Sequence, residues 1–308
     1  FNLRHPALRR IALMMAPMML GIGAYQFNFV ISRLLATKLP QGSIAYLFYA
    51  FRFFEFPQGI FTIALGVAVL PSFARLVSRG KTEEFTEEVN FALRMMLFIT
   101  IPAMIGLIML RVPIINLILQ RGAFTYTSTV MTAQALLYYS LSLWAYGGIQ
   151  VLSRAFYALN EIKTPVTMAI GALMVNSVLG FILMGPLLHG GLALAMSIAA
   201  TVNISLLAFF FHRKTSGLRL RALAVTVIKT IVATIPVAVV AILVEQGYTW
   251  SESGGYAAKI PLLGGGIIVT MALFFFCSYL LRNRELYLLW EVMRRGRARQ
   301  RPSSTPQG

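Results

Sequence analysis

The sequence predicts an all-α protein that crosses a membrane about eight times, and three observations support this fold class. Apolar residues make up 58% of the 308 residues and charged residues only 12%, whereas charged residues make up about 25% of an average soluble domain. The mean hydropathy is +0.74, so a soluble fold would expose large apolar patches. Several apolar segments reach the length of about 20 residues that a helix needs to span a bilayer.

The first half of the chain contains four of these segments. The second and fourth exceed the minimum length, so we expect each to tilt, kink or extend beyond the membrane, with Pro57 and Gly59 as the kink points of the second. Residues 78–90 form a polar linker, and residues 111–127 form an apolar piece too short to span, which we expect to lie in the interface or re-enter. The segments cover residues 11–36, 44–77, 91–110 and 128–157.

The second half contains four more apolar segments, followed by a basic tail. The first two are separated only by the end of "MGPLLHGG", which predicts a tight helical hairpin. The single cysteine, Cys277, lies in an apolar run, so no disulfide can form within this chain. The tail ends in "RPSSTPQG", a composition that cannot bury a core. The segments cover residues 165–187, 191–211, 223–245 and 260–281.

The distribution of basic residues predicts the orientation in the membrane. Lys and Arg number 27 against 10 Asp and Glu, for a net charge of +17. Most of them fall in connections on one side of the expected topology, together with both termini. Because Lys and Arg are retained on the cytoplasmic side, we predict cytoplasmic termini, and the charge needs no nucleic-acid partner. The opposite side carries only Lys38, Arg111, Arg121 and Lys259.

The most informative polar residues lie in "YAFRFFEFPQG", residues 49–59. Arg52 and Glu55 stand in an apolar segment, where each charge costs roughly 2.5–3.5 kcal/mol on insertion. Since residues three apart share a helix face, the two can neutralise each other. Alternatively, that face lines a cavity in which Arg52 binds an anionic substrate through its planar fork and Glu55 orients it. The residues leave both interpretations open.

Other polar side chains in the apolar segments are further candidates. Gln26 and Asn28, in the first segment, are candidate substrate contacts. Asn176 is a candidate cation ligand, although a single amide in an apolar helix more often bonds across a helix contact. Arg154 lies near a helix end, where we expect an interface anchor, with the cavity as the alternative.

No pattern typical of an enzyme occurs. His5, His189 and His212 lie far apart, in or next to connections, and none has the spacing of metal ligands or a catalytic triad. The glycine run "LLGGG" at residues 262–266 lacks the lysine of a phosphate-binding loop. We therefore predict no enzymatic activity, no cofactor and no metal site.

Four stretches of the sequence resemble one known family. The block "YAFRFFEFPQGIFTIALGVAVLPSFARLVSRGKTEEF" and the shorter "RGAFT", "AFYALNEIKTPV" and "HGGLALAMSIAATVN" are similar to the lipid II flippases, the MurJ or MviN family. That family belongs to the multidrug/oligosaccharidyl-lipid/polysaccharide exporter superfamily. The resemblance runs from about Arg9 to at least Arg213, in matching order and spacing.

The resemblance implies a division of the chain. Members have two six-helix lobes followed by a final helix pair. By this likeness, residues 1–213 are the second lobe, residues 214–281 the two additional helices, and residues 282–308 a basic cytoplasmic tail. The first lobe would then be a missing partner, because the chain is either a fragment or half of a split protein.

The resemblance also implies a function. It is movement of lipid II, the undecaprenyl-pyrophosphate-linked peptidoglycan precursor, between the leaflets of the bacterial inner membrane by alternating access, among membrane lipids. Arg52 matches the family's cavity arginine, expected to engage the pyrophosphate. Phe51 replaces an aspartate of many relatives. Gly180 replaces a carboxylate of some relatives, and this second departure weakens the case for a cation at Asn176. The alternatives are another exporter of the superfamily, moving a lipid-linked oligosaccharide or a drug, or a non-transporting scaffold half.

Overall fold

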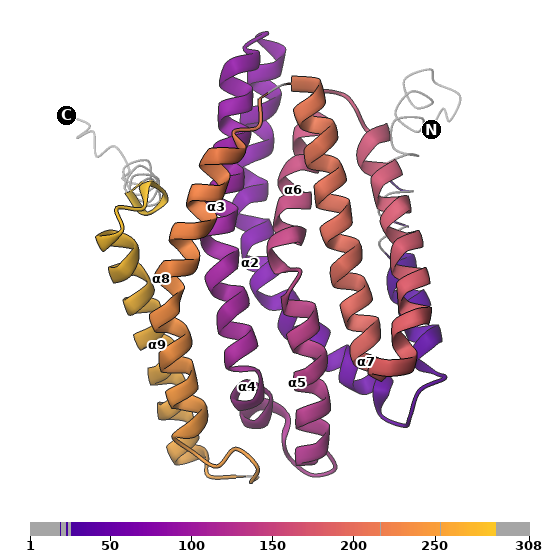
Figure 1. Ribbon diagram of the computed structural model, residues 1–308, viewed down its shortest axis with the longest axis vertical. Helices are drawn as coiled ribbons and strands as arrows, with labels where there is room; N and C mark the ends of the chain where they lie inside the picture. The colour runs from indigo at the N-terminus through magenta and orange to yellow at the C-terminus, as the bar shows by residue number, and fades with distance from the viewer. Residues whose placement is uncertain (1–18, 20–22, 24–25, 216, 253, 288–308) are drawn as a thin grey trace, which may run out of the picture.

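The computed structural model describes residues 19, 23, 26–215, 217–252 and 254–287, without the side chains of residues 61–68. Within these residues all regular secondary structure is helical (Figure 1), which confirms the predicted fold class. Most of the first apolar segment and the tail beyond residue 287 lie outside the described residues.

The labelled helices follow the apolar segments closely, and residues 26–36 form a helix before them. By length and composition, α3, α7, α8 and α9 could each cross a membrane. The labelled helices are α2 (Ser43–Ser78), α3 (Thr82–Met109), α4 (Arg111–Leu119), α5 (Tyr126–Ser140), α6 (Leu143–Ala158), α7 (Lys163–Thr215), α8 (Leu220–Gln246) and α9 (Tyr256–Leu280).

The prediction of a polar linker over residues 78–90 is too long, because α3 already begins at Thr82. Phe85 and Val89 are fully buried on one face of this polar first part, and the Phe85 ring lies 5.5 Å from that of Phe73 on α2. The acidic residues of the first turn also suit the positive end of the helix dipole. Helix α3 therefore continues beyond the apolar segment as an amphipathic helix.

The long segment expected at residues 128–157 is broken into α5 and α6, as its length predicted. Two serines flank the break, and both hydroxyls donate to backbone carbonyls: Ser140 to Leu136, and Ser142 to Tyr139, each at 2.7 Å. Such bonds compete with regular helix geometry. Before the break, α4 is too short to span, in agreement with the prediction for residues 111–127.

The predicted hairpin at "MGPLLHGG" is present inside α7. Leu188 has φ 50° and ψ −133°, which ends one limb, residues 163–187, and starts the other, residues 189–215. Figure 1 shows the two limbs side by side. A Cβ at Gly191 would lie 2.1 Å from the carbonyl oxygen of Leu183, so the limbs approach this closely only with glycine there.

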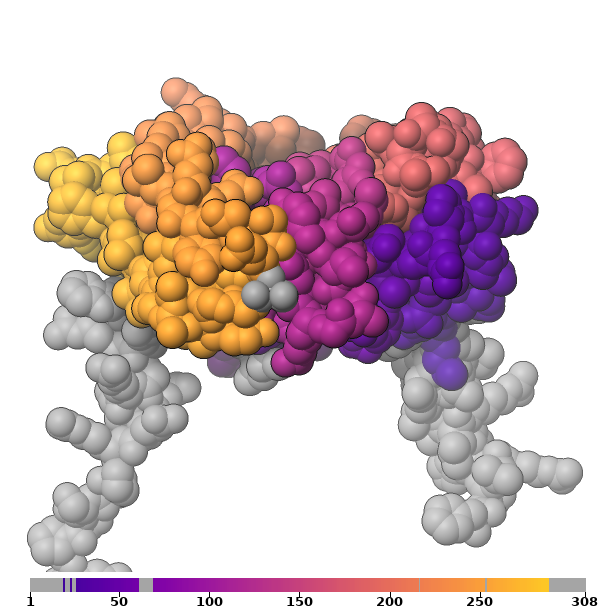
Figure 2. All heavy atoms as spheres, turned by 90° about the horizontal axis from the view of Figure 1, so that it is seen from below, coloured from indigo at the N-terminus to yellow at the C-terminus, as the bar shows by residue number. Residues whose placement is uncertain are grey.

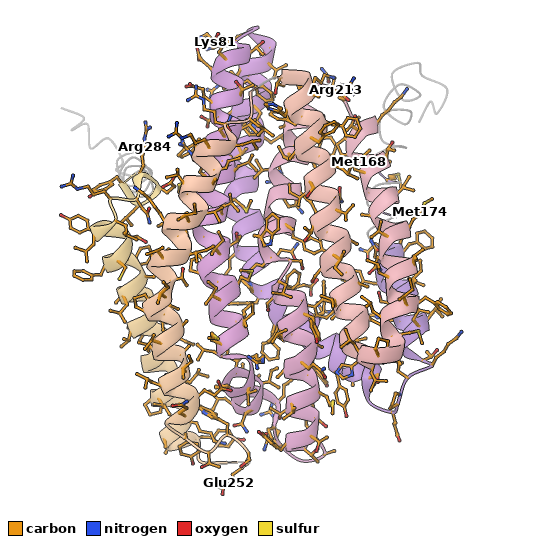
Figure 3. All side chains as sticks on the ribbon, viewed as in Figure 1. Lys81, Met168, Met174, Arg213, Glu252 and Arg284 are labelled. Atoms are coloured by element: carbon orange, nitrogen blue, oxygen red, sulfur yellow. The ribbon has the colours of Figure 1, made fainter. Side chains whose placement is uncertain are left out.

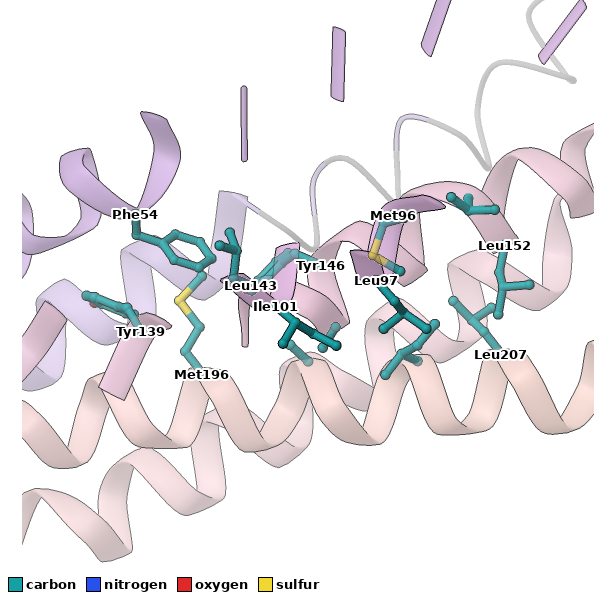
Figure 4. Close-up of a cluster of buried hydrophobic side chains, with 14 of the residues drawn as sticks. Phe54, Met96, Leu97, Ile101, Tyr139, Leu143, Tyr146, Leu152, Met196 and Leu207 are labelled. Carbon is teal, nitrogen blue, oxygen red and sulfur yellow. The ribbon is translucent and has the colours of Figure 1, made fainter. Parts of the chain in front are cut away.

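Helices α2, α3, α5, α6 and the second limb of α7 share one apolar core. Its side chains include Phe54, Met96, Tyr146 and Met196 (Figure 4). Helices α8 and α9 lie at one edge of the molecule, and the helix of residues 26–36 with the start of α2 lies at the other (Figure 2). Many large side chains of α9 point outward, including Ile268, which is 70% exposed, as suits contact with lipid tails.

Charged residues mark the two ends of the helix bundle. Lys81, Arg213 and Arg284 lie toward one end, here called the Lys81 end, and Glu252 lies at the other, the Glu252 end (Figure 3). An ion pair between Lys214 and Glu161 holds the end of α7 to the α6–α7 connection at the Lys81 end. The helix directions thus alternate as the topology requires.

Candidate functional site

A cavity of about 650 Å³ opens between α2, α6 and the two limbs of α7. Part of its wall consists of small side chains, which leave room between the helices: Ala169 and Ala172 on the first limb, Ala199 and Ala200 on the second. Among the polar residues that line it are Asn28, Glu55, Gln58, Gln150, Ser153, Arg154, Tyr157, Asn176 and Asn203.

The cavity reaches from the Lys81 end to the middle of the helices. On α6, Gln150, Arg154 and Tyr157 share one face at the spacing of successive helix turns. Arg154 lies about 6 Å of helix rise from the end of α6 at Ala158. Asn176 and Asn203 lie roughly 18–20 Å from the ends of their limbs. A polar path therefore leads from the end of the bundle to its centre.

A second pocket of about 200 Å³ lies between α2 and the helix of residues 26–36. Gln26, Arg33, Arg52 and Glu55 are among its lining residues. Arg52 lies about 14 Å of helix rise from Ser43, the start of α2 at the Glu252 end. Since Glu55 lines both pockets, it stands at the junction between them.

Arg52 and Glu55 form the ion pair that their spacing allows. Arg52 Nη1 donates to Glu55 Oε2 at 2.8 Å, and the guanidinium lies 5.2 Å from the centre of the Phe48 ring. The Arg52 side chain is 64% exposed and that of Glu55 40%. The pair therefore neutralises the charges without sealing Arg52 away from a ligand.

Of the other candidates, Asn28 and Asn176 form a hydrogen bond with each other, and Gln26 lies apart from them. Asn176, 2% exposed, donates from Nδ2 to Asn28 Oδ1 at 3.0 Å, across the contact between α7 and the helix of residues 26–36. Gln26 instead lines the smaller pocket beside Arg52. The cation site at Asn176 stays a prediction; its observed partner is an amide, as expected for a contact between helices.

Arg154 lines the larger cavity, as in the second of its two sequence interpretations, and the interface-anchor role stays a prediction. Its Nη1 is buried without a hydrogen-bond partner, and so are Asn176 Oδ1 and Asn203 Oδ1. Leaving a buried polar atom unpaired costs about 1–3 kcal/mol. Gln58 and Tyr157 were not among the sequence candidates, although the three-residue spacing of Arg154 and Tyr157 could have indicated one polar helix face.

Long apolar helices around a polar cavity define a multi-pass membrane protein. The same fold occurs in an outward-facing multidrug resistance MATE family transporter of the MOP superfamily, with a TM-score of 0.60 and 13% identity over 89% of this chain and 66% of the other. At that identity the likeness concerns the fold alone.

The chain belongs to the lipid II flippase MurJ family, whose model matches residues 1–255. It is 31% identical to the probable lipid II flippase MurJ of Buchnera aphidicola subsp. Acyrthosiphon pisum, over 94% of this chain and 57% of the relative. It is 34% identical to that of Vibrio cholerae over 68% and 40%.

A solved structure described as lipid II flippase MurJ in an inward closed conformation also matches. The TM-score is 0.68 and the identity 26%, over 91% of this chain and 57% of the other. The chain thus spans about half the length of the relatives that it matches.

Proposed function

We propose that this chain forms the second lobe and final helix pair of a flippase that moves lipid II from the inner to the outer leaflet by alternating access. The observation that carries the proposal is the polar cavity with arginine within its long apolar helices, in a chain of the MurJ family. Residues 1–213 are the lobe, residues 214–281 the additional helices, and residues 282–308 the tail. A first lobe completes the transporter.

The chemistry of the lining residues suits a lipid-linked pyrophosphate. Arginine binds phosphate oxygens through two parallel hydrogen bonds, and Arg52 and Arg154 supply two such groups. The amides of Gln58 and Gln150 can bond to a polar headgroup. Movement of a lipid forms and breaks no covalent bond, so the site needs no nucleophile and no cofactor.

The alternative functions fit the same residues less well. An exporter of cationic drugs needs carboxylates in its cavity, and Glu55 is the only one that lines the larger cavity among the described residues. That carboxylate is already paired with Arg52. A scaffold half that transports nothing would need neither the cavity nor its arginines.

For the orientation, we expect the Lys81 end to face the cytoplasm, because positive residues concentrate there. In a Cys277→Ser background, Ser78→Cys should be shielded from a membrane-impermeant thiol reagent in intact cells, and Thr127→Cys should react. Both side chains are exposed at their helix ends. Labelling of Ser78→Cys together with protection of Thr127→Cys would reverse the orientation.

For the function, cells depleted of their own flippase should regain lipid II in the outer leaflet when they produce this chain with a first lobe. The measurement is cleavage of lipid II by an added enzyme that cannot cross the membrane. An unchanged inner pool, with the protein present at normal membrane abundance, would contradict transport. If growth returned without lipid II movement, the scaffold alternative would hold instead.

A further inference from the structure

Arg154 and Arg52 stand at different depths, in two pockets that share Glu55 as a lining residue. Arg154 lies about 6 Å of helix rise from the end of α6 at the Lys81 end. Arg52 lies about 14 Å of helix rise from the opposite end of α2. Glu55 lines both the larger cavity, which holds Arg154, and the smaller pocket, which holds Arg52. An anion that moved from the larger cavity past Glu55 into the smaller pocket would meet the two guanidinium groups in succession.

The two arginines also differ in their hydrogen-bond and ion-pair partners. Arg52 donates to the Glu55 carboxylate at 2.8 Å and lies over the Phe48 ring. The Nη1 nitrogen of Arg154 is buried and has no acceptor. Among the described residues, Arg154 forms no ion pair, and the nearby Glu161 is paired with Lys214. Arg154 is therefore the cavity cation whose hydrogen-bonding capacity is unmet.

The neighbours of Arg154 fit an anion with attached hydroxyl and amide groups. Gln150 and Tyr157 flank it on the same face of α6, and Pro165 and Val166 at the start of α7 border the same opening. A confined, partly desolvated cation attracts an anion more strongly than an exposed one, because solvent screens it less. The guanidinium fork selects phosphate-like groups among anions.

We infer that Arg154 is the loading residue of the transport path: it binds the pyrophosphate of the lipid at the Lys81 end before the anion passes to Arg52. This inference rests on the proposed function and deepens it. Glu55 separates the two positions, because its carboxylate repels an anion and holds Arg52 in a neutral pair while Arg154 is being loaded. When the anion reaches Arg52, it replaces Glu55 as the partner of the guanidinium.

Binding of a soluble probe to the full chain in detergent micelles tests this assignment. The probe is geranylgeranyl pyrophosphate, with geranylgeraniol as the uncharged comparison. Arg154→Gln should weaken pyrophosphate binding about tenfold, the loss of one charge-assisted contact, and Arg154→Lys should weaken it less. The matched control is Arg213→Gln, an exposed arginine at the same end outside the cavity, which should bind like the wild type.

A charge-rescue measurement guards against a variant that merely folds poorly. In a Cys277→Ser background, Arg154→Cys should regain binding after modification with an ethylammonium methanethiosulfonate, but not with a neutral reagent of the same size. Bound probe should slow the modification.

The outcomes separate this inference from the proposed function. Wild-type affinity in Arg154→Gln, or equal effects of the two reagents, would overturn the loading role and leave the proposed function intact. A wild-type chain that fails to bind the probe would overturn the loading role, whereas the proposed function is decided by the transport assay on the chain joined to a first lobe. Loss of binding in Arg154→Gln with rescue by the cation would support the loading role even if the transport assay failed.

Discussion

In the chain joined to a first lobe, Arg52→Ala is expected to abolish lipid II movement while the protein still accumulates in the membrane. The Arg52 side chain is 64% exposed, so little packing is lost; under the proposed function, what is lost is the charge and the two-pronged contact with the pyrophosphate. Arg52→Lys should keep part of the activity, because an ammonium supplies charge without the fork. The measurement is cleavage of outer-leaflet lipid II by an impermeant enzyme, with membrane abundance determined on the same cells.

The double variant Arg52→Leu with Glu55→Leu separates substrate binding from a structural ion pair. If the pair served only to neutralise two charges, removing both would restore abundance and activity together. Because the pair lines a pocket and is not part of the apolar core, we expect an abundant but inactive protein. The matched control replaces Lys81 and Glu84, an exposed pair with the same spacing at 2.7 Å, and should stay active. Full activity of the Arg52 and Glu55 double variant would refute the binding role.

The second large effect is expected at Lys259, which joins α9 to α4. Lys259 is 1% exposed. Its Nζ donates to Asn116 Oδ1 at 2.8 Å and to the Glu252 carbonyl at 2.6 Å, and it lies near the rings of Tyr248 and Trp250. Asn116 Nδ2 in turn donates to the Trp250 carbonyl at 2.5 Å. This network holds the α8–α9 connection against α4 at the Glu252 end.

Lys259→Met should lower the free energy of unfolding by about 1–3 kcal/mol, because the buried Asn116 Oδ1 and the partly buried carbonyl of Glu252 lose their donor. Asn116→Leu should lower it further, since it leaves a buried ammonium short of acceptors, and an incompletely paired charge costs more than an unpaired carbonyl. Thermal unfolding in detergent, followed by tryptophan fluorescence, measures both; Trp250 lies within the network.

The control for this network is Lys38→Met, an exposed lysine expected to be neutral. Equal melting temperatures for Lys259→Met and Lys38→Met would show that the network does not hold the helix pair. If Asn116→Leu proved milder than Lys259→Met, the ammonium would not be the costly group, contrary to the argument from charge.

The sequence by itself determined the helices, the hairpin and the ion pair. The length of each apolar segment predicts whether it crosses a bilayer as a helix, because a backbone in lipid must form its hydrogen bonds within the segment. The long segment 128–157 indicated its own break, and the spacing of Arg52 and Glu55 predicted their contact. These features depend on residues close together along the chain.

Only the tertiary structure decided which polar residues meet. Lys259 counted as a charge in an outer connection, yet it is buried between α9 and α4. Asn28 and Asn176, 148 residues apart, form one hydrogen bond. Arg154 on α6 lines a cavity whose wall also includes residues of α2 and of both limbs of α7. The physical reason is that hydropathy measures the apolar character of each segment, whereas burial and hydrogen bonding depend on which helix faces pack together.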